Sequence, residues 1–429
     1  MNHLRSMEVK FVYSPAAHRL CLLLLFSTAL CVLHAEETSS PPAHGTFATQ
    51  LQPFVDEHYI SGAVALVANQ ERVLDVTTVG YSSLSTKTPL REDSLFWLAS
   101  ISKTFVATAM MMLVDEGKVN VDDPVAKYLP EFKGQLVTDK KGNHPPQHPM
   151  LVKELLTHTS GIIGPNDPPI KKNLDLADDI RQYAATPLKW EPGTKFEYNN
   201  AGINTAGRII EVASGMSYGD FIKQRILDPL GMTDTTFWPD EKLAARLAQT
   251  SQWDKEKSVL EDIPNQPDQV WLNQKQVPLP MRVYMGGEAL RAYPNRYAWP
   301  AGGLFSTAGD LVKYGQAMLN GSAVNGKPLV SAASFKRMTT LEPCMTGIKA
   351  APGIGLGWFV TRNDNDGVAT GSFGHHGARG PVIWVDPSNK LVVILLYESM
   401  DIQTRGDAKS RFEKTFFRAA VAKYGKAVK

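Results

Sequence analysis

The hydrophobic and polar pattern predicts a helix followed by two strands near the start of the chain. Apolar residues recur at helical spacing over residues 46–59, which is typical of an amphipathic helix. Two apolar runs follow, at 63–68 and 73–79, and the polar residues 69–71 between them predict a turn. Helix followed by hairpin is a common opening for an α/β domain.

The middle of the chain has the periodicity of helices. Residues 133–149 are mostly polar and predict an exposed, irregular loop, and residues 250–300 are rich in Gln, Asn and Pro, which predicts a long ordered loop region beside a cleft. The helices predicted in this part cover residues 152–158, 175–184, 201–214 and 218–227.

Strands return near the end of the chain. Apolar or alternating runs at 357–361, 382–385 and 391–397 predict three strands, and a final helix carries Phe412 and Phe416 on one side. We therefore expect an α/β (α+β) fold in which both ends of the chain build one antiparallel sheet flanked by helices, with a largely helical insertion between them. The sheet part covers about 46–99 and 350–425, the helical part covers about 100–349, and the active cleft lies where the two parts meet.

The first 35 residues have the pattern of a secretory signal peptide. Basic residues at 5, 10 and 19 precede an apolar run over 20–33, which is too short for a comfortable membrane span. We expect a secreted or periplasmic protein without a membrane span after cleavage, and a single domain over 36–429. An uncleaved N-terminal anchor is the alternative.

Charge and cysteine content exclude several function classes. The formal net charge of +2 falls near zero without the signal segment, so neither nucleic acid nor an anionic membrane surface is an expected partner. After cleavage only Cys344 remains, so the chain can form no internal disulfide. The histidine pairs 144/148 and 375/376 lack a third ligand, so we predict no metal and no cofactor.

The segment around Ser100 is the first candidate for catalytic chemistry. Ser100 precedes the run 106–114, which is apolar except at Thr108 and predicts a helix buried nearly all round. Lys103 follows three residues later on the same face of that helix. A serine needs a base to take its proton, and burial can lower the pKa of a lysine enough for it to serve. The alternative is a serine that only caps the helix and a lysine on the surface.

Two further motifs carry candidate site residues. Tyr198 and Asn200 precede a helix; a tyrosine near an ammonium can relay a proton, and the asparagine amide can bind a substrate carbonyl. The alternative is a packed tyrosine and a helix cap from Asn199 or Asn200. The glycine-rich stretch 374–380 lies just before the strand 382–385 and can bring a backbone N–H close to a substrate, to form an oxyanion hole with that of Ser100. The alternative for its histidines is a polar strand turn.

Taken together and in this order, the three motifs resemble the serine β-lactamase and penicillin-binding protein family. The class C β-lactamase-like group is the closest match, with its D-alanyl-D-alanine carboxypeptidases, D-aminopeptidases and family VIII esterases. The resemblance covers residues 46–425 and implies a β-lactamase/transpeptidase-like fold. Stretches that support it are 155–161, 190–193, 226–232 and 301–307.

The resemblance implies a role for each site residue. Ser100 would be the acylated nucleophile, Lys103 its proton partner and Tyr198 the base or relay. Substrate would contact Asn200, His375 and Gly377, and the N–H groups of Ser100 and Ala378 would form the oxyanion hole. Which of the lysine and the tyrosine takes the first proton stays open.

The sequence departs from the family pattern at His375, where many relatives have the lysine of a Lys-Thr-Gly motif. A neutral histidine holds a substrate carboxylate poorly near pH 7, although Arg379 could replace the missing charge. We therefore expect a serine hydrolase of esterase or peptidase type that acts on a small ester, peptide or β-lactam. The alternatives are a β-lactamase or D-alanyl-D-alanine carboxypeptidase that acts on peptidoglycan, and a non-catalytic penicillin- or peptidoglycan-binding protein.

Overall fold

The computed structural model describes residues 43–140, 142–164, 175–263, 271–272, 275–276, 296–324, 326–345, 347–348, 353–364 and 367–425. All of them belong to one unit, Pro41–Lys429. The predicted signal peptide and most of the stretch 264–295, which the sequence places beside the cleft, lie outside the described residues.

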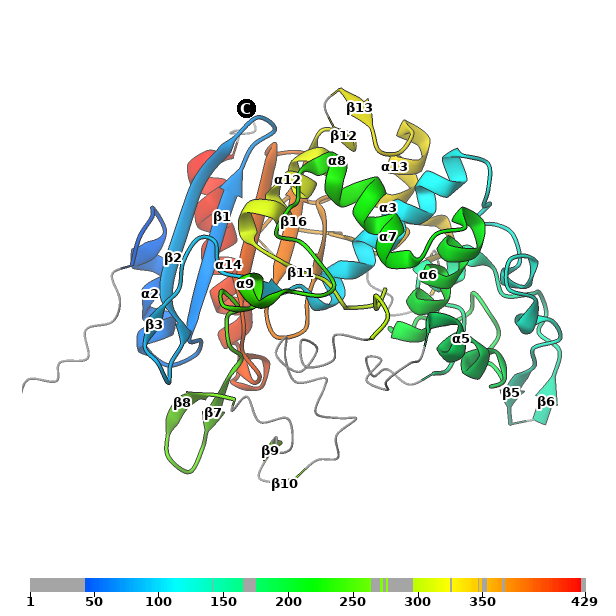
Figure 1. The fold of residues 1–429 in the computed structure, drawn as a ribbon, viewed down its shortest axis with the longest axis horizontal. Helices are drawn as coiled ribbons and strands as arrows, with labels where there is room; N and C mark the ends of the chain where they lie inside the picture. Colours follow the sequence, from blue (N-terminus) through cyan, green and yellow to red (C-terminus); the bar gives the residue numbers. More distant parts are fainter. Residues whose placement is uncertain are drawn as a thin grey trace, which may run out of the picture. The chain divides into compact units, whose positions relative to one another are not determined.

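A seven-stranded antiparallel sheet is built from both ends of the chain, as predicted (Figure 1). Its strand order is β14-β15-β16-β17-β1-β2-β3, so the first strand of the chain pairs with the last. The strands are β1 (Gly62–Ala68), β2 (Val73–Ser83), β3 (Thr88–Pro89), β14 (Phe359–Val360), β15 (Phe373–His376), β16 (Val382–Asp386) and β17 (Leu391–Tyr397).

Both faces of the central strands are buried, which explains why these strands are apolar throughout rather than alternating. In β1, Val64 and Leu66 pack into the larger core on the side of the helical part. Ala65 and Val67 face the opposite core, which also contains Phe412 and Phe416 of the C-terminal helix. Figure 1 shows α2 (Ala48–Asp56) and α14 (Ala408–Tyr424) on that second face, and α12 (Ala308–Leu319) contacts β16, β17 and β1 from the first.

The helical part surrounds α3 (Ser102–Asp115), whose residues are all buried from Ser102 to Leu113. Gly117 has φ +69° just past the end of α3, the left-handed conformation that favours glycine there. None of the described helices has the length and apolar composition that a membrane-spanning helix needs. The other helices are α4 (Val152–Leu156), α5 (Leu176–Ala184), α6 (Asn200–Ser214), α7 (Tyr218–Ile222), α8 (Asp228–Leu230), α9 (Glu241–Ala244) and α13 (Ala332–Thr339), and a π-helical turn covers Lys223–Leu227.

Small two-stranded units correct two sequence predictions. The loop 133–149 is exposed but not irregular, because it contains the hairpin β5 (Val137–Asp139) and β6 (Gly142–His144). The stretch 250–300 begins with another hairpin rather than a loop. The glycine-rich stretch 374–380 begins in strand β15 of the seven-stranded sheet and continues into a turn at Ala378 and Arg379. The strands of the two hairpins are short and mostly polar, so they lack the apolar pattern that reveals strands in a sequence. The further pairs are β4 (Phe96–Trp97) with β11 (Phe305–Ser306), β7 (Ser251–Asp254) with β8 (Val259–Asp262), β9 (Trp271–Leu272) with β10 (Lys275–Gln276), and β12 (Ala323–Val324) with β13 (Lys327–Pro328).

Candidate active site

Ser100 and Lys103 lie in contact at the start of the buried helix α3. Ser100 is in a 3-10 turn, Ala99–Ile101, that leads directly into the helix. The Nζ atom of Lys103 donates hydrogen bonds to Ser100 Oγ at 2.9 Å and to the carbonyl oxygen of Ala301 at 2.6 Å. Lys103 is 0% exposed, so the alternative of a surface lysine is wrong.

Burial determines the electrostatics of Lys103. Desolvation lowers the pKa of its amine well below the ordinary value of 10.5, and no carboxylate in the described part of the chain offsets this effect. A lysine with such a pKa is readily neutral. Its lone pair can then accept the Ser100 proton across the 2.9 Å contact, which is the requirement for nucleophilic attack by a serine.

The backbone of Ala301 holds Lys103 in place. Its carbonyl oxygen accepts from Lys103, while its N–H donates to the side-chain oxygen of Asn204 on α6 at 3.1 Å. Asn204 is fully buried, so this bridge ties α3 to α6 inside the core. In the sequence, Ala301 is one residue of the supporting stretch 301–307. The Gly302-Gly303 pair that follows is the one feature that draws attention to this position.

Tyr198 lies beside Lys103, in the loop before α6. The Nζ atom of Lys103 is 4.9 Å from the centroid of the Tyr198 ring, and Tyr198 is 38% exposed. Asn199 is the residue that caps α6, because its side-chain oxygen accepts from the N–H of Gly202 at 2.9 Å. Asn200 is the first residue of that helix and is buried. The helix cap and a partly exposed tyrosine therefore coexist in this motif.

His158 is a second neighbour of Tyr198 that the sequence did not single out. Its ring centroid lies 4.4 Å from that of Tyr198, and its Nδ1 accepts from the N–H of Asn199 at 3.4 Å. Burial, followed by the charge of Lys103, lowers the pKa of His158 from 6.5 to about 3, so the ring is neutral at ordinary pH. The stretch 155–161 contained the only signal for this residue.

His375 reaches the site from the sheet. It lies on β15 with its ring 4.8 Å from that of Phe359 and 6.4 Å from that of Tyr198. Burial and, to a smaller extent, Lys103 lower its pKa well below 6.5. Its Nδ1 is 2.7 Å from the carbonyl oxygen of His376, which can only accept, so the neutral ring carries its proton on Nδ1. His375 and His376 therefore lie on strand β15 and not in a polar turn, and the turn of this motif follows at Ala378 and Arg379.

Gly377 brings the end of β15 against the chain that leads to Ser100. A Cβ atom at Gly377 would lie 2.5 Å from the carbonyl oxygen of Leu98, which leaves no room for a side chain. Ala99, between Leu98 and Ser100, has φ +46°, a strained conformation for alanine. Ala378 follows Gly377 and is exposed. The predicted oxyanion-hole residues therefore belong to two segments that contact each other.

The arrangement contains the parts of an acyl-transfer site: a serine, a desolvated lysine, a tyrosine and a close strand edge. Lys103 and Tyr198 come from the helical part and His375 comes from the sheet, so the site lies where the two parts meet. Among the described residues, no group of three or more His, Cys, Asp or Glu side chains could hold a metal ion.

Comparison with known proteins places the chain in a family. Esterase EstB from Burkholderia gladioli is 29% identical over 80% of this chain and 88% of its own length. Penicillin-binding protein 4 from Amycolatopsis lactamdurans is 29% identical over 88% of this chain and 89% of its own. The solved structure of EstCE1, described as a hydrolase with promiscuous acyltransferase activity, has the same fold, with a TM-score of 0.68 at 22% identity over 86% of this chain and 96% of its own. The family model described as Beta-lactamase matches residues 47–414, and the chain therefore belongs to the beta-lactamase family of serine hydrolases.

Proposed function

We propose that the protein hydrolyses an ester or amide through an acyl-enzyme on Ser100, and that esters or acylated peptides are better substrates than β-lactams. The observation that carries this proposal is the 2.9 Å contact between Lys103 Nζ and Ser100 Oγ inside the core. Such a contact activates a serine only if the lysine can be neutral, and the burial of Lys103 meets that condition.

The reaction takes two steps. The Ser100 proton moves to Lys103, a bond forms between Ser100 Oγ and the acyl carbon, and the bond to the leaving group breaks as that group receives a proton. A water molecule then attacks the acyl carbon, the bond from that carbon to Ser100 Oγ breaks, and a proton of the water passes to Ser100 as the acid is released. Tyr198, which is near Lys103 and partly exposed, would relay protons between the lysine and the leaving group or water.

The segments next to Ser100 and Lys103 would bind the substrate and stabilise the negative charge that develops on it. The N–H groups of Ser100 and Ala378 would hold the oxyanion that develops on the carbonyl oxygen. Asn200 would contact the substrate amide or ester carbonyl, and Gly377 would let the strand edge approach it. No step requires a metal or an organic cofactor.

The preference for esters over β-lactams rests on His375. A buried histidine with a strongly lowered pKa is neutral near pH 7 and supplies no charge to a substrate carboxylate. Penicillins and D-alanyl peptides end in such a carboxylate, whereas simple esters do not. Relatives of both kinds exist, an esterase and a penicillin-binding protein, so a D-alanyl-D-alanine carboxypeptidase acting on peptidoglycan is the second candidate function.

Intact mass measurement tests the proposal. Purified protein is mixed with a penicillin and, separately, with a short-chain activated ester, with Ser100→Ala as control. We expect Ser100-dependent ester turnover, reduced at least about 10³-fold in the variant, and no lasting penicillin adduct. A long-lived penicilloyl adduct lost in Ser100→Ala would favour the carboxypeptidase. Near-normal turnover in Ser100→Ala would refute the mechanism, and binding without turnover would favour a non-catalytic binding protein.

We further propose that the protein is secreted or periplasmic. The support is the basic and apolar pattern of residues 1–35. Fractionation of producing cells with N-terminal sequencing checks this proposal. A mature chain in the cytoplasm that still starts at Met1 would refute it, and a membrane-bound chain with the segment retained would favour the anchor.

A further inference from the structure

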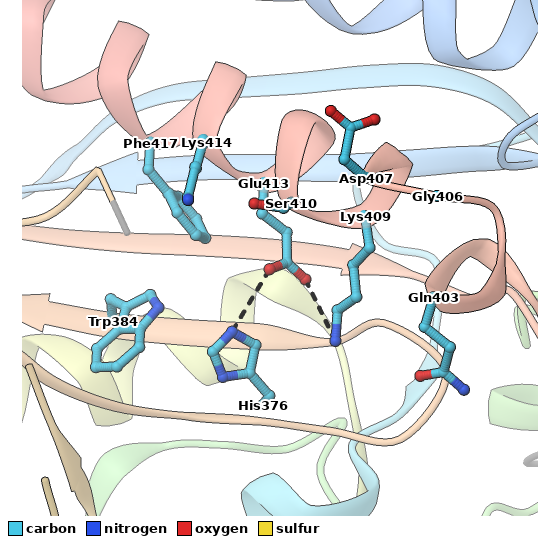
Figure 2. A pocket seen from close by; sticks show the side chains of 10 residues that line it. All are labelled: His376, Trp384, Gln403, Gly406, Asp407, Lys409, Ser410, Glu413, Lys414 and Phe417. Atoms are coloured by element: carbon cyan, nitrogen blue, oxygen red, sulfur yellow. Dashed lines mark ion pairs between the residues drawn. The ribbon is translucent and has the colours of Figure 1, made fainter. Parts of the chain in front are cut away.

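A pocket lies on the face of the sheet opposite the proposed active site (Figure 2). Successive strand residues point to opposite faces, so His375 faces the site while His376 and Trp384 face α14. The cavity has a volume of about 270 Å³, below the range of drug-sized pockets, and suits a small ligand. It is lined by His376, Trp384, Gln403, Gly406, Asp407, Lys409, Ser410, Glu413, Lys414 and Phe417.

Within the described part of the chain, the indole N–H of Trp384 is a donor without an acceptor. The side chain is 3% exposed, and its Nε1 atom finds no hydrogen-bond partner among the described residues. Figure 2 shows this nitrogen on the edge of the ring that faces His376, inside the lining of the pocket. An indole nitrogen can only donate, and a buried donor is costly to leave unpaired. A ligand with an acceptor atom would satisfy it.

The buried carboxylate of the pocket is already neutralised. Glu413 accepts a hydrogen bond from the Tyr397 hydroxyl at 2.9 Å, lies 3.5 Å from His376 Nε2 and 3.8 Å from Lys409 Nζ. Figure 2 marks the last two contacts with dashed lines. Because these groups use both carboxylate oxygens, Glu413 is not available to bind a cation.

Among the described residues, one lysine that lines the pocket has no ion-pair partner. Asp407 pairs with Arg411 at 3.0 Å, and Lys409 pairs with Glu413. Within the described part of the chain Lys414 has no ion pair, and Figure 2 shows it beside Phe417, projecting from α14 toward the strand of Trp384. One negative charge on a ligand would balance this ammonium, and the buried rings of Trp384 and Phe417 offer apolar walls next to it.

We propose that this pocket binds a small monocarboxylate, with its oxygens on Lys414 and the Trp384 indole N–H and its apolar part against Phe417. The site is separate from the one at Ser100, because the sheet lies between them. Nothing in the proposal depends on the reaction at Ser100.

Titration of the full chain labelled with ¹⁵N-tryptophan tests the proposal. Sodium benzoate is added at constant ionic strength, and Trp384→Phe identifies the indole resonance of Trp384. We expect that resonance to move along a saturable curve. Lys414→Gln should weaken the affinity at least about tenfold, since a hydrogen bond to a charged group is lost. Lys423→Gln, in the last turn of the same helix and outside the lining, should leave it unchanged.

Three outcomes would overturn the proposal. They are the absence of a saturable shift at Trp384, an equal affinity in Lys414→Gln, and tighter binding of inorganic phosphate, a dianion, than of benzoate. Calorimetry on the wild type and Lys414→Gln gives the affinities without any change at Trp384, so a Trp384→Phe chain that failed to fold would not prevent the test.

Discussion

The ring of His158 packs against the ring of Tyr198 with 4.4 Å between the centroids, and His158 does so from a backbone φ of +57°. The histidine is buried and carries a pKa of about 3, and its Nδ1 accepts a hydrogen bond from the N–H of Asn199. His158 therefore packs against Tyr198 as a neutral ring. Protonation of His158 would place a second positive charge next to the ammonium of Lys103.

Acid should therefore destabilise the fold through His158. Its pKa is about 3 in the folded chain and 6.5 as the ordinary value, so the unfolded chain binds more protons between these limits. The contribution of neutral His158 to the free energy of unfolding is complete above pH 6.5. Below that pH the free energy of unfolding falls by about 1.4 kcal/mol per pH unit, which amounts to about 2 kcal/mol between pH 7 and pH 5. Urea unfolding at both pH values measures this loss. His375 contributes in the same direction.

His158→Asn separates the two histidines. Asparagine tolerates a positive φ and does not titrate, so the variant should lose stability at pH 7 but show a smaller drop between pH 7 and pH 5. An unchanged pH dependence would mean that His158 is protonated in the folded chain. His58→Asn, at an exposed position with a φ of +59°, is the matched control and should leave the drop as it is in the wild type.

Activity should rise with pH as Lys103 loses its proton. Its pKa lies well below 10.5, and only the neutral amine can accept the Ser100 proton. Lys103→Arg keeps the charge at every pH, so kcat/KM should fall about 10²- to 10⁴-fold and lose this rise. Initial rates with an activated ester across the pH range measure both effects. Lys127→Arg, at an ion pair with Asp123, should behave as the wild type; a full pH rise in Lys103→Arg would assign the base to another group.

The pairing of Ser100 and Lys103 could be predicted because the two residues are three apart on one helix, where local geometry decides which side chains meet. The sheet built from both ends of the chain could also be predicted, because its central strands are continuous apolar runs in the sequence. His158 and Ala301 were not predictable as neighbours of the site. Their contacts join segments far apart in sequence, and they depend on a positive φ and on a backbone carbonyl, neither of which leaves a pattern in residue types.

Gly377→Ala should impair the reaction without unfolding the protein. Its Cβ atom would lie 2.5 Å from the Leu98 carbonyl oxygen, so β15 and the Ser100 turn would have to separate. A shift near 1 Å at reacting groups costs about 10²-fold in rate. Gly309→Ala in α12 is the control, because its nearest neighbour would be 3.9 Å away and alanine favours a helix. Steady-state kinetics should show a lower kcat only for Gly377→Ala. Equal rates would mean that the approach of the two segments is not needed.

His375→Lys should shift the preference toward substrates with a carboxylate. The introduced amine would face the site from β15 and restore the charge that a neutral histidine lacks. Because the position is 2% exposed and near Lys103, burial and like charge would lower the pKa of that amine, so the gain should be larger at low pH. A charge-assisted hydrogen bond corresponds to about tenfold, the expected rise in penicillin acylation relative to ester turnover. Mass spectrometry and initial rates give this ratio.

Two control variants should keep the wild-type ratio. They are His375→Gln and His376→Lys, whose side chain points to Glu413 on the opposite face of the same strand. An unchanged ratio in His375→Lys would show that charge at this position does not set the preference, and the substrate carboxylate would then have to be bound by another cation.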